Sequence, residues 1–265
     1  MRFMKSLLFL FTGMLLLLGC QDPSLPSAVL SSTVRSANIV LINAAPDAPS
    51  PQPFLINNAQ AASVGFPGGS VPTAINAGIE QFRIKNATYG VVTPDTVSQK
   101  ADLVTQTSAS AIQGSGNYTM ILTDTVNRPF GKGTGYNSNK GGLTFTMLAE
   151  TLTAPTSGNG GIRFFNLAPG AASVYLTHDG GSTFSGLTSS FAYKKTTTTF
   201  TSIPAGSYTL EVRTGSASGT LIASIPSTAI ASGKLYTVFL SGKVVKIGTS
   251  SVVKVPYSLS VVGHN

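Results

Sequence analysis

The sequence contains few of the residues on which most enzyme sites and most helical proteins depend. Its 265 residues include one cysteine, two histidines and no tryptophan, and only 10% are charged, against about 25% in an average globular chain. A single cysteine excludes an intramolecular disulfide and a zinc site built from several cysteines. The low charge, beside an ordinary apolar content of 42%, excludes a disordered polyelectrolyte and a coiled coil.

Small and hydroxyl-bearing residues take the place of the charged ones. The chain has 28 glycines, 15 prolines and 63 serines and threonines taken together. Glycine and proline favour turns, and threonine favours strands over helices. The composition therefore predicts an all-β protein of short strands joined by turns.

The first twenty residues have the features of a secretory leader. Arg2 and Lys5 precede an apolar run from Leu7 to Leu18, and the run ends at Gly19-Cys20. A membrane-spanning helix needs about 20 apolar residues, so this run is too short to remain as a span. We expect a leader that is removed from the mature protein.

The segment Leu17-Leu18-Gly19-Cys20 resembles the lipobox of bacterial lipoproteins. The resemblance implies that the Cys20 thiol is alkylated with diacylglycerol, that the leader is cut before Cys20, and that the new amino group is acylated, for example with palmitate. Two or three such chains hold a protein at a membrane durably, whereas one chain does so only marginally. The alternative is an ordinary signal peptide with an incidental cysteine.

These features divide the N-terminal part of the chain into a signal peptide, 1–19, and a lipidated flexible tether, 20–36. The tether contains Pro23 and Pro26 among serine and small residues, a composition that favours a linker over a packed segment. Gln21, by similarity to the sorting rule of Gram-negative lipoproteins, implies transfer to the outer membrane. Whether the protein faces the periplasm or the cell surface stays open.

Three sequence blocks occur twice, in the same order, in the rest of the chain. Both members of each pair contain the sequence pattern of a strand and one shared short motif. In the first pair the motif is Asn shortly before Ala-Pro, in the second it is Ala-Gly before the strand, and in the third it is Tyr-Thr shortly after Gly. The pairs are Ile39–Ala48 with Ile162–Ala171, Ala77–Lys85 with Ala205–Arg213, and Ser115–Leu122 with Ser232–Leu240. Ordered internal repeats of this kind indicate two homologous units.

The turn-rich segment 156–160 is the expected linker between the two units, which span 37–155 and 161–265. Short strands with turn signals between them are typical of antiparallel sandwiches. We therefore expect two tandem immunoglobulin-like antiparallel β-sandwich domains, each with its own core. The expected core residues are Leu41, Phe82, Ile84, Tyr118, Ile121, Leu122, Phe164, Tyr175, Leu210, Val212, Tyr236 and Phe239.

At these blocks the chain resembles the bacterial family of the domain of unknown function 4397 (DUF4397). The resemblance is carried by residues 43–49 (Asn-Ala-Ala-Pro-Asp-Ala-Pro), 204–206 (Pro-Ala-Gly) and 233–237 (Gly-Lys-Leu-Tyr-Thr). Gly170 and Asn76 depart from the family pattern, which has Asp and Pro at these places. The resemblance covers nearly the whole mature chain as two tandem copies. It implies secreted or lipid-anchored β-sandwich proteins without an established catalytic role or active site.

The residues that usually carry catalysis are sparse. His178 and His264 are the only side chains expected to titrate near neutral pH. His178 lies in a turn-forming Thr-His-Asp-Gly-Gly sequence, and His264 is the second-last residue, where chains usually fray. The Gly-x-Ser-x-Gly elbow, metal-ligand spacings and nucleotide-binding glycine motifs are absent. We therefore expect no catalytic residue, no cofactor and no metal, and interpret the protein as a non-enzyme.

One segment of the first unit is a candidate binding loop. Residues 127–142 are long for a hairpin connection and contain cations and aromatics but no acid. The candidate partner-binding residues are Phe130, Lys132, Tyr136 and Lys140. Aromatic and polar loops of this kind stack on a sugar ring or grip a protein partner. The alternative is a glycine-rich loop that binds nothing.

Two short segments, Asp95-Thr96-Val97 and Asp124-Thr125-Val126, resemble the O-glycan acceptor pattern of some Gram-negative envelope proteins. The resemblance implies glycosylation of the two threonines as a minor alternative. Intact mass of the mature protein tests it.

The mature chain is basic, because removal of the leader leaves 15 basic and 9 acidic residues. The basic residues are scattered singly, which argues against a nucleic-acid partner and favours contact with anionic lipid or polysaccharide. The leading hypothesis is a non-enzymatic lipid-anchored cell-envelope protein with a structural, adhesive or ligand-binding ectodomain. Its partners would be the membrane, through the anchor, and an envelope polysaccharide or protein. The alternative is an envelope hydrolase or an accessory subunit of a polysaccharide-handling complex.

Overall fold

The computed structural model describes residues 35–46, 50–57, 59–85, 102–103, 110–125, 143–169, 171–242 and 255–265. These residues form strands and turns and no helix, which confirms the predicted all-β class. Residues 35–265 belong to one compact unit. Within the described ranges, no helix is long and apolar enough to cross a membrane.

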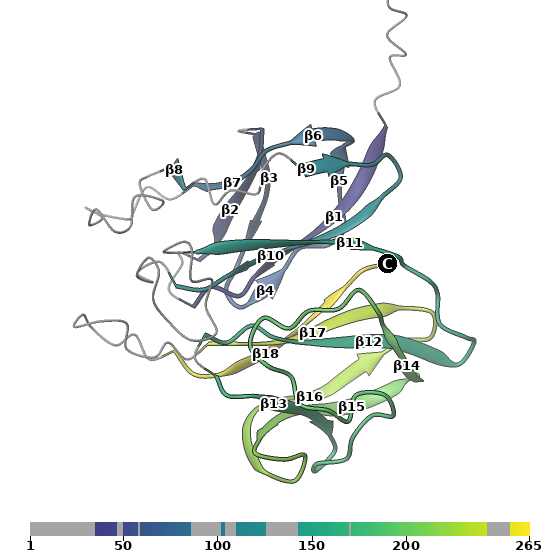
Figure 1. The fold of residues 1–265 in the computed structure, drawn as a ribbon. Helices are drawn as coiled ribbons and strands as arrows, with labels where there is room; N and C mark the ends of the chain where they lie inside the picture. The colour runs from purple at the N-terminus through teal and green to yellow at the C-terminus, as the bar shows by residue number, and fades with distance from the viewer. Residues whose placement is uncertain are drawn as a thin grey trace, which may run out of the picture. The chain divides into compact units, whose positions relative to one another are not determined.

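Strands β1 to β11 form three sheets in the first half of this unit (Figure 1). Their bounds are β1 Ser36–Asn43, β2 Gln52–Ile56, β3 Ala59–Val64, β4 Gly68–Gly69, β5 Thr73–Asn76, β6 Gly78–Glu80, β7 Phe82–Lys85, β8 Asp102–Leu103, β9 Ser110–Ile112, β10 Asn117–Thr123 and β11 Thr144–Glu150. One sheet runs β11-β10-β1, and both β4 and β5 pair with β1. A second sheet has the order β3-β2-β7-β8, and β6 pairs with β9.

Strands β12 to β18 form two sheets in the second half. Their bounds are β12 Asn159–Asn166, β13 Val174–His178, β14 Thr201–Pro204, β15 Gly206–Thr214, β16 Thr220–Ile230, β17 Leu235–Ser241 and β18 Ser258–Gly263. One sheet has the order β14-β12-β17-β18 and the other the order β13-β15-β16. β12 begins at Asn159, within the segment 156–160 that the sequence predicts as a linker. The division into two domains at this segment stays a prediction.

The two halves share one strand order. The series β11-β10-β1-β5 in the first half matches β18-β17-β12-β14 in the second, and β2-β7-β8 matches β13-β15-β16. The pairing directions match as well. β1 runs parallel to β10, with Asn43 opposite Leu122, and β12 runs parallel to β17, with Asn166 opposite Leu240.

The parallel pairs differ from the expectation of wholly antiparallel sheets. All other strand pairs in the described residues are antiparallel. A parallel pair needs a long crossover between its strands. Here the chain leaves β1, builds the β2-β7 sheet, and returns to lay β10 beside β1 in the same direction. The second half repeats this route from β12 to β17.

The apolar side chains form three clusters. One lies between the two main sheets of the first half and includes Leu41 and Phe82. Another lies between the two sheets of the second half and includes Phe164 and Leu210. The third joins the halves, with Val40, Ile42, Ala44 and Ile121 against Phe165, Leu167, Phe239 and Val262.

The third cluster explains why β1 is apolar on both faces, and why Phe165 of β12 is buried against the first half. Alternate residues of a strand point to opposite sides of its sheet, so Ile39 and Leu41 face the core of their own half while Val40 and Ile42 face the other half. All five residues from Ile39 to Asn43 are buried. The unit therefore has a sheet-on-sheet junction at its centre, between the β1-β10 and β12-β17 pairs.

The expected core residues are buried in the structure except for two tyrosines, Tyr175 and Tyr236, which are half-buried. Ile121 and Phe239 belong to the cluster between the halves and not to the core of either half.

Candidate functional site

An arginine side chain lies at the centre of the junction between the halves. Arg163 of β12 is fully buried (0% exposed). Its guanidinium donates to both carboxylate oxygens of Glu150 in β11, from Nη1 to Oε2 at 2.8 Å and from Nη2 to Oε1 at 2.6 Å. Nε donates to Thr237 Oγ1 at 2.8 Å, Nη2 to Thr119 Oγ1 at 3.3 Å, and Nη1 to the Thr197 carbonyl at 2.9 Å.

Aromatic rings cover the guanidinium of Arg163. Its central carbon lies 4.8 Å from the ring centre of Phe165 and 4.3 Å from that of Phe200, which is cation–π distance. Glu150 is also fully buried in its side chain. The buried cation therefore has a bidentate carboxylate, three further oxygen acceptors and two rings, which together replace the water lost on burial.

The repeated Tyr-Thr sequence has two roles: the threonines bind Arg163 at the junction, and the tyrosines bind the turns that precede their strands. Thr119 and Thr237 occupy equivalent places in β10 and β17, and both accept hydrogen bonds from Arg163. The tyrosine before each threonine closes the turn that precedes its strand. Tyr118 Oη accepts from the Gln113 amide at 2.8 Å, and Tyr236 Oη accepts from the Ala231 amide at 3.3 Å.

The repeated Asn before Ala-Pro has a local role that is the same in both halves. Asn43 Oδ1 accepts from the Ala45 amide at 3.2 Å, and Asn166 Oδ1 accepts from the Ala168 amide at 3.3 Å. An asparagine side chain that binds the backbone two residues on forms an Asx-turn, which mimics a backbone turn. The repeated asparagine therefore stabilises the turn that follows β1 in the first half and β12 in the second.

His264 is buried, so the prediction of a fraying C-terminus is wrong. The residue is only 4% exposed, Nε2 lies 2.7 Å from Thr237 Oγ1, and the ring meets the Phe200 ring edge to face at 5.3 Å. The His264 amide donates to the Leu235 carbonyl at 2.9 Å. Burial, and then the Arg163 charge, lower the pKa of His264 to about 3. The terminus is held because its last residues line the junction.

A second polar cluster joins the halves at Asp124, which follows β10. Asp124 is 0% exposed and accepts from Tyr193 Oη at its Oδ1 and from Thr144 Oγ1 at its Oδ2, both at 2.6 Å. Lys194 forms an ion pair with Asp124 Oδ2 and also donates to Thr144 Oγ1 at 2.8 Å. Asp124 and Lys194 both have left-handed backbone conformations, with φ of 68° and 60°.

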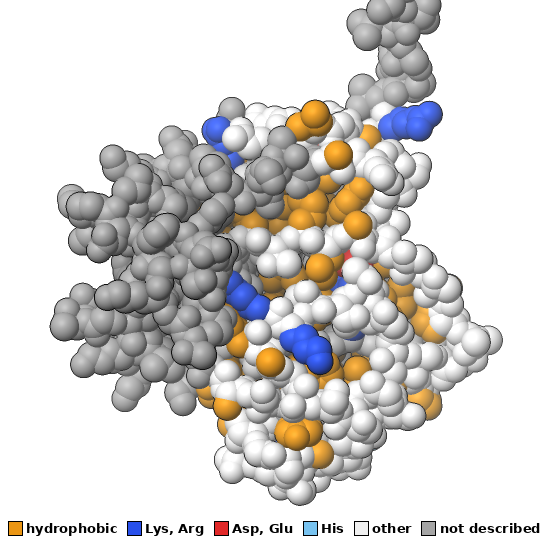
Figure 2. Space-filling view, viewed as in Figure 1, with side chains coloured by type: hydrophobic (Ala, Val, Ile, Leu, Met, Phe, Trp, Pro, Cys, Tyr) orange, Lys and Arg blue, Asp and Glu red, His pale blue; other side chains and the backbone are white. Residues whose placement is uncertain are grey.

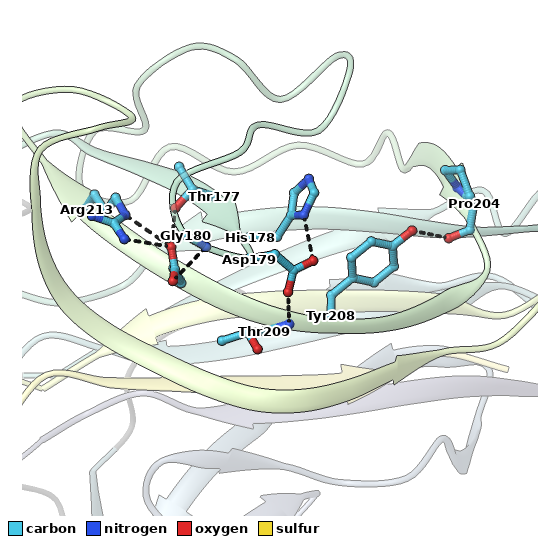
Figure 3. A network of polar contacts seen from close by, with 9 residues as sticks. Thr177, His178, Asp179, Gly180, Pro204, Tyr208, Thr209 and Arg213 are labelled. Atoms are coloured by element: carbon cyan, nitrogen blue, oxygen red, sulfur yellow. Dashed lines mark hydrogen bonds and ion pairs between the residues drawn. The ribbon is translucent and has the colours of Figure 1, made fainter.

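His178 is the last residue of β13 and not a member of the turn that the sequence predicts, which begins at Asp179, and its side chain is only 20% exposed. Figure 3 shows the polar contacts around it. Nδ1 lies 3.0 Å from Asp179 Oδ2, while Asp179 Oδ1 accepts from the Thr209 amide at 2.8 Å. The imidazole stacks on Phe184 with ring centres 4.2 Å apart and meets Tyr208 edge to face at 5.3 Å. The aromatic contacts and the carboxylate fix the turn to β15.

Glu211 of β15 joins β13, its own strand and the turn after β13 through Thr177, Arg213 and Gly180, which are labelled in Figure 3. Its Oε2 accepts from Arg213 Nη2 at 3.0 Å and from Thr177 Oγ1 at 3.3 Å, and its Oε1 accepts from the Gly180 amide at 3.2 Å. Burial by itself raises the pKa of Glu211, but hydrogen bonds from Arg213 and the Gly180 amide outweigh it and lower the pKa. The Thr209 amide, followed by His178, lowers the pKa of Asp179. Both groups act as anionic acceptors in a structural network.

Most of the sequence-predicted site residues lie outside the described residues. They are Cys20 and the four loop residues Phe130, Lys132, Tyr136 and Lys140, together with the Asp95-Thr96-Val97 segment. The Asp124-Thr125 pair is described, and Thr125 is 0% exposed. A buried hydroxyl does not fit a glycan acceptor, and Asp124 is held by partners in both halves.

The sequence gives no role in an inter-half cluster to Arg163, Glu150 or Lys194, and it presents Asp124 and His264 in other roles. Arg163 is a single cation between Ile162 and Phe164 in an otherwise apolar strand. Because a buried cation needs a paired partner, this pattern indicates a buried ion pair. Glu150 precedes the expected linker and carried no comparable signal. In the described part of the chain, no three His, Cys, Asp or Glu side chains come together as a metal site would require.

A pocket adjoins the Arg163 cluster, and it takes in residues from both halves. Its lining consists of Asn38, Val40, Pro72, Asn117, Tyr118, Glu150, Leu152 and His264.

On the molecular face drawn in Figure 2, Lys and Arg side chains are few and stand apart from one another among uncharged ones.

Comparison with known proteins identifies the family of the chain. No curated protein matches the sequence. The model of one family, described as Domain of unknown function (DUF4397), matches residues 37–177, which is more than half of the chain. The match includes β1, β10 and β11 and continues through β12, so it contains both Glu150 and Arg163. The chain belongs to the DUF4397 family.

Proposed function

We propose that this chain is a lipid-anchored protein of the bacterial cell envelope whose two β-sandwich modules, 37–155 and 161–265, form one rigid, non-catalytic ectodomain. The lipobox-like sequence ending at Cys20 supports the anchor. The common strand order of the two halves, including a parallel pair in each, supports two copies of one immunoglobulin-like module.

The observation that carries the proposal is the junction between the halves. It combines an apolar cluster from both central sheets with the fully buried pair of Arg163 and Glu150. Removing one member of such a pair costs about 3–5 kcal/mol, so the junction resists opening. A chain built in this way serves as a spacer or a platform.

The placement of the ionisable side chains supports a structural or binding role over the hydrolase alternative. A hydrolase of the glycosidase type needs two carboxylates across a cleft. Among the described residues, Glu150, Asp124 and Glu211 lie in separate clusters, each with its own cationic partner. His178 is engaged by Asp179 and stacked on Phe184.

The proposed ligand is an anionic envelope polysaccharide or a protein partner, bound through the segment that contains Phe130, Lys132, Tyr136 and Lys140. Purified protein is expected to bind polygalacturonate, used as an anionic polysaccharide probe, with an affinity that falls as salt rises. Replacing Lys132 and Lys140 by Ala should weaken binding, and replacing the exposed Lys195 by Ala should not. Binding that ignores salt would contradict the charge-based part of the proposal.

The anchor is tested by replacing the lipidated residue. Cys20→Ser is expected to move the protein from the membrane fraction to the soluble fraction and to abolish incorporation of labelled fatty acid. Ser24→Ala, in the same tether, is the matched control and should stay in the membrane fraction. A Cys20→Ser protein that remains with the membrane would overturn the proposal.

A further inference from the structure

Asp124 and Lys194 bring a carboxylate and an amine from the two halves into direct contact. Asp124 follows β10 and is 0% exposed, while the Lys194 side chain lies in the segment before β14 and is 20% exposed. The amine contacts Oδ2 of the carboxylate. Two hydroxyl groups complete the arrangement: Tyr193 Oη donates to Oδ1 and Thr144 Oγ1 donates to Oδ2, both at 2.6 Å.

We propose that Lys194 Nζ and Asp124 Cγ form an intramolecular amide bond that joins the two halves of the chain. The reaction would be a condensation of one amine with one carboxylic acid and would release one water molecule. It requires no cofactor, oxidant or second substrate. It also does not depend on the membrane anchor, so it can fail while the proposed function stands.

The surrounding groups supply the three elements that amide formation needs. The nucleophile is the Lys194 amine. Tyr193 donates to Oδ1, the oxygen that remains in the amide, and would stabilise the negative charge that develops there. Thr144 accepts from Nζ at 2.8 Å and donates to Oδ2, so its hydroxyl connects the proton donor to the leaving oxygen.

The proton and electron balance follows these contacts. The Lys194 ammonium first gives one proton to Oδ2, leaving a neutral amine and a carboxylic acid. The amine lone pair then attacks Cγ, and the C=O pair moves onto Oδ1 beside Tyr193. The Thr144 hydroxyl relays a second proton from nitrogen to Oδ2. The pair on Oδ1 re-forms the carbonyl, the Cγ–Oδ2 bond breaks, and Oδ2 leaves as water.

The local backbone and the cysteine content are consistent with a covalent link here. Lys194 and Asp124 both hold left-handed backbone conformations, which are uncommon for lysine and concentrate at functional positions. The sequence has one cysteine, so no disulfide within the chain can join its halves. An amide between Asp124 and Lys194 would link residues that lie far apart in the sequence.

The test is mass spectrometry of the purified mature protein under denaturing conditions. The expected intact mass is lower by one water molecule than the mass calculated for the chain with its N-terminal modification. A tryptic digest should contain one branched peptide that joins the segments around Asp124 and Lys194. Full mass, or loss of water on a linear peptide, would overturn the proposal and leave an ion pair.

Variants distinguish the mass loss caused by the Asp124–Lys194 amide from a loss of water at another position in the chain. Lys194→Arg keeps the cation but lacks the amine, and it should restore the full mass. Lys195→Arg changes the neighbouring exposed lysine and should leave the branched peptide in place. Tyr193→Phe removes the donor to Oδ1 and should leave a larger unlinked fraction. A branched peptide that persists in Lys194→Arg would also overturn the assignment.

Discussion

Arg163 and Glu150 face each other across the junction between the two halves, and both carboxylate oxygens accept from the guanidinium, at 2.6 and 2.8 Å. Neither side chain is exposed. The pair lies where β11 of the first half meets β12 of the second, beside the apolar cluster that the central sheets share. It therefore ties the stability of each half to the presence of the other.

Glu150→Gln is expected to lower the free energy of unfolding by about 3–5 kcal/mol, because it leaves the buried Arg163 cation without its counter-ion. Urea unfolding followed by circular dichroism measures the change. The double variant Arg163→Met with Glu150→Met should recover much of the loss, since apolar side chains remove the unpaired charge. Lys195→Met, at an exposed cation, is the control and should change stability by less than about 0.5 kcal/mol. A Glu150→Gln protein as stable as the wild type would contradict the role of the pair.

His264 gives the protein an acid-sensitive stability. Its pKa in the folded chain is about 3, against an ordinary value of about 6.5, so between these pH values the folded form is neutral and the unfolded form is charged. Unfolding then takes up a proton, and stability falls as pH drops below about 6.5, by at most about 1.4 kcal/mol per pH unit.

The His264 prediction is checked by urea unfolding of the wild type and His264→Gln at pH 7 and pH 5. Glutamine does not titrate and retains a side-chain hydrogen-bonding group for Thr237. The wild type should lose more stability than the variant over this interval. Equal losses in the two proteins would show that His264 does not couple protonation to folding.

The close approach of β4 to β18 depends on the absence of a side chain at Gly69. A Cβ at this position would overlap the methyl groups of Val262. Gly69→Ala is therefore expected to destabilise the protein by about 1–3 kcal/mol, as overpacking does. Val262→Ala in the same chain should relieve part of this cost. If Gly69→Ala is neutral alone, the two strands are not packed as the structure has them.

The two turn-closing tyrosines should both contribute to stability. Tyr118→Phe removes the acceptor of the Gln113 amide, and Tyr236→Phe removes that of the Ala231 amide. Each change is expected to lower the free energy of unfolding by about 1 kcal/mol, measured by thermal unfolding. Tyr118→Phe should cost more, because its hydrogen bond is shorter (2.8 against 3.3 Å) and more buried. A stabilising effect of either change would contradict the assigned role.

The strands were largely predictable from the sequence because their signals are local. The alternating pattern of Phe82 and Ile84, or of Leu210 and Val212, places one residue in two against a core, and these four residues are buried as expected. The two Tyr-Thr strands are marked by the same kind of local signal, an apolar run shortly after Gly. The parallel pairing of β1 with β10 cannot be predicted from such signals, because it depends on the route of the chain between strands and not on either strand alone.

The junction between the halves could not be placed from the sequence for a related reason. A run such as Ile39-Val40-Leu41-Ile42 indicates a strand buried on both faces, but it does not say what covers the second face. Arg163 signalled a buried partner without identifying Glu150, and His264 looked like an ordinary terminal residue. Each of these roles depends on a partner from another strand, which only the folded chain brings into contact.

The central claim, that the two halves form one rigid body through a buried junction, is most directly tested by differential scanning calorimetry of the purified protein. The expected result is a single unfolding transition whose calorimetric and van't Hoff enthalpies agree, shifted to lower temperature by Glu150→Gln. Two separate transitions in the wild type, of which Glu150→Gln moves neither, would contradict it.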